Sequence, residues 1–383
     1  MKRHGWWLAL MLIGCGAAHG QWQILNSGTT ADLRGIDNVG GGVAWASGTN
    51  GTVLRTEDGG YLWQPCAIPP GAEKLDFRGI QAFDANTAIV MSSGTGDLSR
   101  LYKTTDGCQT WKLMFTNPDK DGFWDAMRFA DRQHGYLFGD PVSLGGSSEH
   151  RFELEQTYDG GETWKLWQRE IYKLKASGNS CGFAASNSAL LVIDRFQSVF
   201  ATGCVGGPLL YGAVNGSPGI CNCFPMPSEE EWNSILSVSS YAPGPFPKAD
   251  SGGIFSIARA PGGTIVAVGG DYETPDEAAN TSATTIDWGR TWQPAQAPPH
   301  GYRSAVAYYE ATGAWITVGP NGTDVSTDDG RNWRAVHPDA AMHEMPDADR
   351  NWNALSLPYV VGPHGRIGKL DAMAIGASAK PGK

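Results

Sequence analysis

Short runs in which apolar and polar residues alternate recur along the whole chain, and glycine-rich turns separate them. Examples are "TVLRT" at 52–56, "TAIVMSS" at 87–93 and "SRLYKT" at 99–104. A period of two is typical of strands that bury one face, because successive side chains point to opposite sides of a sheet. The pattern therefore predicts an all-β protein.

One eight-residue pattern, Ser/Thr-x-Asp-x-Gly-x-x-Trp, stands between many of these runs, and we call each copy a box. The five copies are "TEDGGYLW" at 56–63, "TTDGCQTW" at 104–111, "TYDGGETW" at 157–164, "TIDWGRTW" at 285–292 and "STDDGRNW" at 326–333. The second copy has Cys108 where the others have glycine. The first three copies stand about fifty residues apart and the last two about forty, which is the length of one four-stranded propeller blade.

Each unit reads as strands A, B, C and D, with the box between C and D. Seven units are expected, with A strands at "LRGIDNV", "FRGIQAF", "WDAMRFA", "GFAASNS", "IFSIARA", "YRSAVAY" and "WNALSLP". The fourth unit has only a degenerate box, and its D strand is expected near "GICNCF" (219–224). The seventh lacks a D strand, which "WQILNSG" from Trp22 would supply. We thus predict a seven-bladed β-propeller of four-stranded antiparallel blades over residues 21–371, closed by its N-terminal strand so that two sheet edges are paired.

Three segments fall outside the repeat. Residues 1–20 combine a basic start with an apolar run too short to span a bilayer, and we predict a signal peptide. Cleavage after Gly20 and lipoprotein-type cleavage before Cys15 both fit, so the protein is expected to be exported: periplasmic, anchored to the outer membrane by lipid, or secreted. We also expect an insertion around 217–252 and a flexible tail at 372–383.

Composition narrows the classes of partner and cofactor. The formal net charge of −10, without any basic run, argues against nucleic-acid binding. No metal-ligand spacing, phosphate loop or dinucleotide motif occurs, so neither metal nor cofactor is predicted, and a monomer is expected. The six cysteines other than Cys15 permit disulfides in an exported chain, with a local bridge favoured among the last four. They are Cys66, Cys108, Cys181, Cys204, Cys221 and Cys223.

The repeated aspartate is interpreted as structural. Its carboxylate can accept hydrogen bonds from the N–H groups of the turn, the glycines can adopt positive φ, and the tryptophan can bury its ring as strand D begins. Five copies of one catalytic group around a single protein would serve no reaction. The aspartates assigned this role are Asp58, Asp106, Asp159, Asp287 and Asp328.

These boxes resemble the Asp boxes, or BNR repeats, of sialidases and sortilin-type receptors, in which the box is a structural turn on the outer part of a blade. Over roughly 21–370 the chain also resembles photosystem II stability/assembly factor-like propellers. The stretches concerned are "WASGTNGTVLRTEDGG", "LYKTTDG", "GDPV", "VGGDY", "GYRSAV" and "VGPNGTD". The resemblance implies a binding patch of arginines on the inner strands, for which Arg34 and Arg78 in "LRGI" and "FRGI" are the closest matches.

Aligning the seven A strands places a polar ring at one end of the central channel, which we call the channel mouth. The aligned residues are Arg34, Arg78, Asp125, Phe183, Phe255, Arg303 and Asn353. The ends of the B strands add Asp140, Asp271 and Tyr272. Guanidinium groups suit bidentate recognition of carboxylate or phosphate.

Three interpretations of the channel mouth are open. The polar groups form a salt-bridge network that plugs the channel, or they bind a peptide, a protein or a small anionic ligand, or they form a glycosidase site. A sialidase-like set would use the three arginines with Tyr272, Glu273 and Asp125, although the Arg-Ile-Pro signature of that family is absent. A plain carboxylate pair would use Asp140 and Asp271. We favour a non-catalytic scaffold, with glycoside hydrolysis as the alternative.

Overall fold

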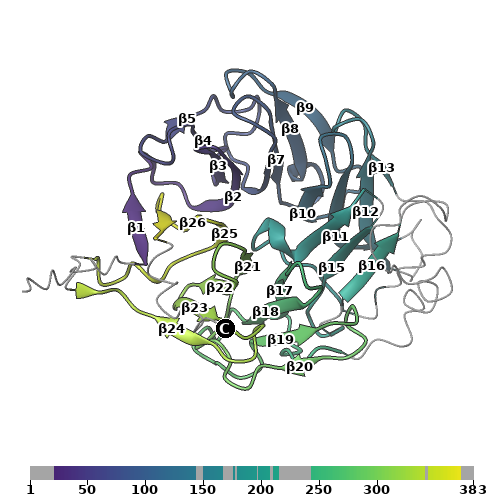
Figure 1. Ribbon diagram of the computed structural model, residues 1–383. Coiled ribbons are helices and arrows are strands. Elements are labelled where there is room, and N and C mark those ends of the chain that lie inside the picture. Colours follow the sequence, from purple (N-terminus) through teal and green to yellow (C-terminus); the bar gives the residue numbers. More distant parts are fainter. Residues whose placement is uncertain are drawn as a thin grey trace, which may run out of the picture.

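The strands form a ring of antiparallel sheets around a common centre (Figure 1). The structure is a computed structural model, and it describes residues 21–143, 150–166, 176, 179–195, 197–207, 210–214, 243–340 and 344–371. The predicted signal peptide, the tail and the part of the insertion at 217–242 lie outside these residues.

Six of the sheets have four strands. Five are continuous in sequence: β2 (Leu33–Gly40), β3 (Val43–Gly48), β4 (Val53–Thr56) and β5 (Gln64–Pro65); β6 (Phe77–Ala82), β7 (Ala88–Ser92), β8 (Arg100–Thr104) and β9 (Lys112–Thr116); β10 (Trp124–Phe129), β11 (Gly135–Ser143), β12 (His150–Thr157) and β13 (Lys165–Leu166); β17 (Gly252–Arg259), β18 (Ile265–Asp271), β19 (Ser282–Thr285) and β20 (Gln293–Pro294); and β21 (Ala305–Tyr309), β22 (Ala314–Gly319), β23 (Gly322–Ser326) and β24 (Arg334–Val336).

The sixth four-stranded sheet joins the two ends of the chain. It consists of β25 (Ala354–Ser356), β26 (Tyr359–Val361), β27 (Ile367–Leu370) and β1 (Trp22–Leu25). The N-terminal strand β1 pairs antiparallel with β27, from Trp22 opposite Leu370 to Leu25 opposite Ile367. The N-terminal strand therefore supplies the missing outer strand of this blade, as the sequence predicts.

The fourth unit differs from the expectation. Its described strands are β14 (Leu190–Asp194), β15 (Gln197–Ala201) and β16 (Leu210–Val214), and they form a three-stranded sheet. The expected A strand "GFAASNS" at 182–188 is wrong, because β14 begins at Leu190 and a 3-10 helix, η2 (Asn187–Ala189), precedes it. The expected D strand at 219–224 lies outside the described residues.

The displaced segment Ser186–Ser188 occupies the centre of the ring, where Figure 1 shows its short teal coil. Asn187 donates to the carbonyl of Ile80 in β6 and accepts from the amide of Met127 in β10. The hydroxyls of Ser186 and Ser188 bond the Ser304 carbonyl and the Ser256 hydroxyl on the other side. All three side chains of the segment are buried, so short polar side chains bridging four blades displace the strand from this position.

All five boxes make the same hydrogen bonds. Each aspartate accepts from the N–H four positions on, at 2.9–3.0 Å, and each first Ser or Thr hydroxyl likewise accepts from the N–H four positions on, at 2.8–3.1 Å. The first three boxes also bond the hairpins between strands A and B, as in Gly107 N–H to the Asn86 carbonyl. The boxes therefore lie at the end of the blades opposite to the start of the A strands.

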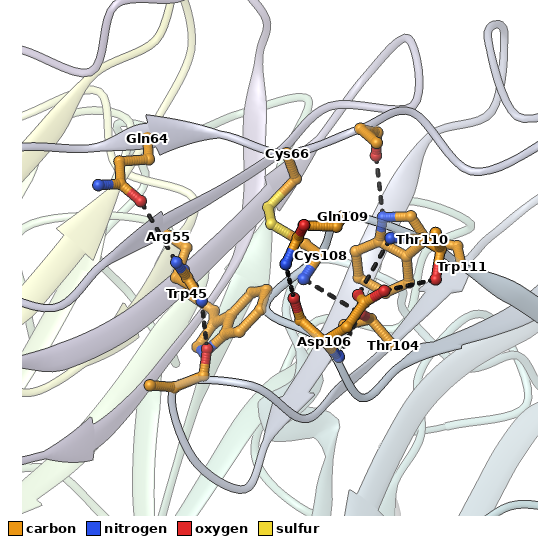
Figure 2. Close-up of a disulfide and its surroundings, with 12 residues drawn as sticks. Trp45, Arg55, Gln64, Cys66, Thr104, Asp106, Cys108, Gln109, Thr110 and Trp111 are labelled. Carbon is orange, nitrogen blue, oxygen red and sulfur yellow. Dashed lines mark hydrogen bonds between the residues drawn. A yellow bond between two sulfur atoms is a disulfide. The ribbon is translucent and has the colours of Figure 1, made fainter.

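Cys108 occupies the position at which the other four boxes have glycine. It has φ of 63°, a conformation that glycine adopts at this position in the first box, and its sulfur is bonded to Cys66 after strand β5 (Figure 2). The disulfide thus ties one blade to the box of the next. A second disulfide joins Cys181 to Cys204, in agreement with the expected local bridge.

We expect Asp159→Ala to lower the free energy of unfolding by about 1–2 kcal/mol, as the loss of other backbone-capping carboxylates does. The substitution leaves Thr163 N–H and both threonine hydroxyls without their common acceptor. Equilibrium denaturation with urea measures the effect. Glu162→Ala in the same turn is the control, because this side chain makes exposed ion pairs only, and an equal loss in both variants would contradict the capping role.

Candidate functional site

Four A strands contain the same irregularity near their start. The register with strand B shifts between Leu33 and Gly35, Phe77 and Gly79, Trp124 and Ala126, and Ile254 and Ser256. The residue skipped in each case is Arg34, Arg78, Asp125 or Phe255. A β-bulge re-aims the extra side chain, and four of the seven residues that the alignment singled out lie at such a bulge.

Arg34 and Arg78, the arginine pair, share one carboxylate. Nε of Arg78 donates to Asp76 at 2.9 Å, and Nε of Arg34 lies 3.8 Å from the other oxygen of Asp76. Asp32 lies 4.0 Å from Arg34. About a third of each arginine side chain is exposed, 30% for Arg34 and 32% for Arg78, so both side chains are partly open to solvent.

Asp125 and Asp140 form an acidic pair beside Gly182. Asp140 accepts from the Gly182 amide at 2.7 Å, and a Cβ on Gly182 would lie 2.0 Å from Oδ2 of Asp125. Asp125 is 2% exposed, and burial raises its pKa well above the usual value, with Asp140 and Glu153 adding to the rise and Arg78 opposing it. Burial also raises the pKa of Asp140 to about 6, against the hydrogen bond from Gly182. Asp125 therefore keeps its proton at pH values where a surface carboxylate is ionised, and Asp140 does so up to about pH 6.

Aromatic side chains occupy the side of the channel mouth formed by the units that contain β14–β16, β17–β20 and β21–β24. The rings of Phe183 and Phe255 stack with centroids 3.8 Å apart, and Tyr302 and Tyr272 meet Phe255 edge-on. Tyr272 is 50% exposed and Phe183 is partly exposed, whereas Phe255 and Tyr302 are buried. We call these four residues the aromatic shelf.

Arg303 does not join the arginine pair, which corrects the prediction for that residue. The guanidinium of Arg303 is fully buried and bonds Asp324, Asn321 and the ring of His300. The side chain of Asn353 donates to the carbonyl of Leu33 and so ties the seventh unit to the first. Both residues precede a strand rather than forming a bulge, and the partly exposed Asn353 lies beside the backbone that leads into Arg34.

The remaining predicted carboxylate, Asp271, ends β18, and its side chain accepts from the Glu273 amide at 2.9 Å. Sequence reasoning missed two further acids, Glu153 and Glu155, which are almost completely buried in β12. Burial raises the pKa of Glu153 to about 7 and that of Glu155 to about 8. Their alternation with Phe152 and Leu154 is the pattern of an outward-facing strand position, so the sequence carried no signal of their burial.

Two hollows lie elsewhere on the molecule and include none of the predicted acids. One of about 460 Å³ is lined by Trp292 and Arg331, and one of about 510 Å³ by Met345 and His364. Among the described residues, no group of three or more His, Cys, Asp or Glu side chains could hold a metal ion. Nor does any helix in the described ranges have the length and apolarity needed to cross a membrane.

The ring of four-stranded antiparallel sheets around a common centre defines a β-propeller. No model of a protein family matches the chain, and no curated protein sequence matches it. Solved structures do match the chain. YCF48 bound to a D1 peptide superposes with a TM-score of 0.54 at 14% identity, covering 91% of this chain and 96% of that one. YCF48 from Cyanidioschyzon merolae gives 0.54 at 15% identity, covering 91% and 98%.

A glycoside hydrolase is similar to the same degree. The GH74 xyloglucanase from Xanthomonas campestris has a TM-score of 0.55 at 14% identity, and the match covers 94% of this chain and 55% of the enzyme. At such identities the likeness shows the fold alone. It places the chain among propellers that include both a peptide-bound protein and an enzyme.

Proposed function

We propose that the protein is an exported, non-catalytic propeller scaffold that binds a peptide or protein partner at the channel mouth. The three-stranded sheet counts as the seventh blade in this proposal, and the boxes are its Asp-box turns. The observation that carries it is the repeated bulge at Arg34 and Arg78, which leaves both side chains partly exposed with Asp76 between them and Asp32 beside Arg34. A carboxylate or phosphate on the partner would complete the pairing.

The structural likeness supports this choice of ligand class. One propeller with the same fold is YCF48 bound to a D1 peptide, so the fold can present a peptide-binding surface. The polar segment Ser186–Ser188 fills the centre of the ring, and a partner would therefore rest on the channel mouth rather than thread through it. Export, with or without a lipid anchor at Cys15, belongs to the same proposal.

Affinity capture tests the proposal. The mature protein and the double variant Arg34→Ala/Arg78→Ala are immobilised and exposed to envelope extract from the producing cells. We expect the double variant to lose its partners or bind them at least tenfold more weakly, as loss of a central arginine pair implies. Arg132→Ala is the matched control, because this exposed arginine lies in the β10–β11 hairpin at the opposite end of the blade. Equal capture by all three proteins would contradict the proposal.

Glycoside hydrolysis is the alternative, and its residues would be Asp125, Asp140, Asp271 and Tyr272. Asp125 is buried, and neither hollow described above includes these acids, which is why we place catalysis second. A screen with xyloglucan, aryl glycosides and sialosides separates the two functions. Turnover that disappears in Asp140→Asn or Asp271→Asn would replace the scaffold proposal.

A further inference from the structure

The partly exposed ring of Phe183, one of the four residues of the aromatic shelf, lies against backbone that carries no side chains. Gly203 and Gly253 form an isolated bridge under Phe183. A Cβ on Gly203 would lie 2.3 Å from Cε2 of that ring, and a Cβ on Gly253 would lie 3.0 Å from it. Two glycines are therefore needed for Phe183 to lie where it does.

A disulfide also holds the segment that carries Phe183. Cys181 and Gly203 exchange backbone hydrogen bonds, and Cys181 is bonded to Cys204, the residue after Gly203. Phe183 follows two residues after Cys181 and stacks on the buried ring of Phe255 with the planes 14° apart. Glycines, a disulfide and a buried ring thus hold the partly exposed ring of Phe183 in place. The ring therefore has little conformational freedom left to lose when a ligand binds.

The aromatic shelf adjoins the arginine pair. Nη1 of Arg78 donates to the carbonyl of Ala184, the residue directly after Phe183, at 3.3 Å. The guanidinium of Arg78 in β6 thus contacts the backbone of the segment before β14 that carries Phe183.

We infer that the channel mouth recognises a peptide that carries a carboxylate next to an aromatic side chain. The carboxylate would bind the arginine pair, and the aromatic ring would pack on Phe183 against the edge of Tyr272. This inference rests on the proposed function, to which it adds the chemistry of the ligand. The fixed position of Phe183 relative to Arg78 means that both groups must lie close together in the peptide.

Fluorescence polarisation with four labelled nonapeptides tests it. The peptides share a Gly/Ser frame and carry Asp-Phe, Asp-Ala, Ser-Phe or Lys-Phe at their centre. We expect the wild-type protein to bind Asp-Phe roughly tenfold more tightly than Asp-Ala or Ser-Phe, and to bind Lys-Phe most weakly. In Phe183→Ala the preference for Asp-Phe over Asp-Ala should fall to about twofold, while acid-dependent binding persists.

Two further variants keep the outcomes distinct. Tyr272→Ala removes an exposed side chain, so it reports on the shelf even where Phe183→Ala fails to fold. Tyr61→Ala, an 87% exposed aromatic in a box at the opposite end, should change nothing. Binding that needs Asp and Arg78 but is equal for Phe and Ala peptides would overturn this inference and leave the proposed function standing. Binding that ignores Arg34→Ala/Arg78→Ala, or favours Lys-Phe, would overturn both.

Discussion

Replacing Asp324 by alanine is expected to lower the free energy of unfolding by about 3–5 kcal/mol, the usual cost of removing one partner of a buried ion pair. Asp324 is 1% exposed and accepts two hydrogen bonds from Arg303, which is itself fully buried. Burial alone would raise the pKa of Asp324, but the hydrogen bonds and charges of His300 and Arg303 hold it below the usual value. The carboxylate is therefore ionised, and its loss removes the hydrogen-bonded counter-charge of a buried guanidinium.

Urea denaturation of three variants measures this effect. Asp121→Ala removes an exposed ion pair with Lys120 and should cost less than about 0.5 kcal/mol. The double variant Arg303→Met/Asp324→Leu should recover most of the loss, because it removes both charges together. A double variant no more stable than Asp324→Ala would show that the cost comes from packing rather than from the unpaired charge.

Stability is expected to fall as the pH rises from about 4 to about 8, because buried acids hold protons that the unfolded chain releases. The pKa of Glu155 is raised by burial to about 8 and that of Glu153 to about 7, whereas an unfolded glutamate titrates near 4.3. In this window the folded state binds more protons than the unfolded state, so the sign is negative. The aspartates in the boxes act the other way only at lower pH. For example, hydrogen bonds from Thr110 lower the pKa of Asp106 to about 2.

Glu155→Gln isolates this contribution, since glutamine carries no charge at any pH. We expect the variant to lose about 2–4 kcal/mol less than the wild type between pH 5 and pH 9, in line with a shift of more than two pKa units. Denaturation curves at pH 5, 7 and 9 give the values. Glu73→Gln, at an exposed position, should leave the pH dependence unchanged. Parallel curves for Glu155→Gln and wild type would show that Glu155 is ionised in the fold.

The candidate site was only partly predictable from the sequence. Alignment of the A strands found Arg34, Arg78, Asp125 and Phe255 because each precedes a small residue in a repeated unit. The same alignment also selected Arg303, which is buried against Asp324, and Asn353, which donates to the carbonyl of Leu33. A bulge occurs at the first four residues and not at these two, and a bulge depends on the pairing of two strands, which the A-strand pattern alone does not record.

The blade repeat and the hydrogen bonds of the boxes follow from local turn chemistry and a period of two, and the missing D strand of the last unit points to β1. Tertiary structure alone decided which polar side chains are buried. Glu153 and Glu155 look like the outward positions of an alternating strand, yet both are almost completely buried. In a propeller each blade packs against two neighbours, so both faces of a strand can be inside, and only the assembled ring shows which charges lose their contact with water.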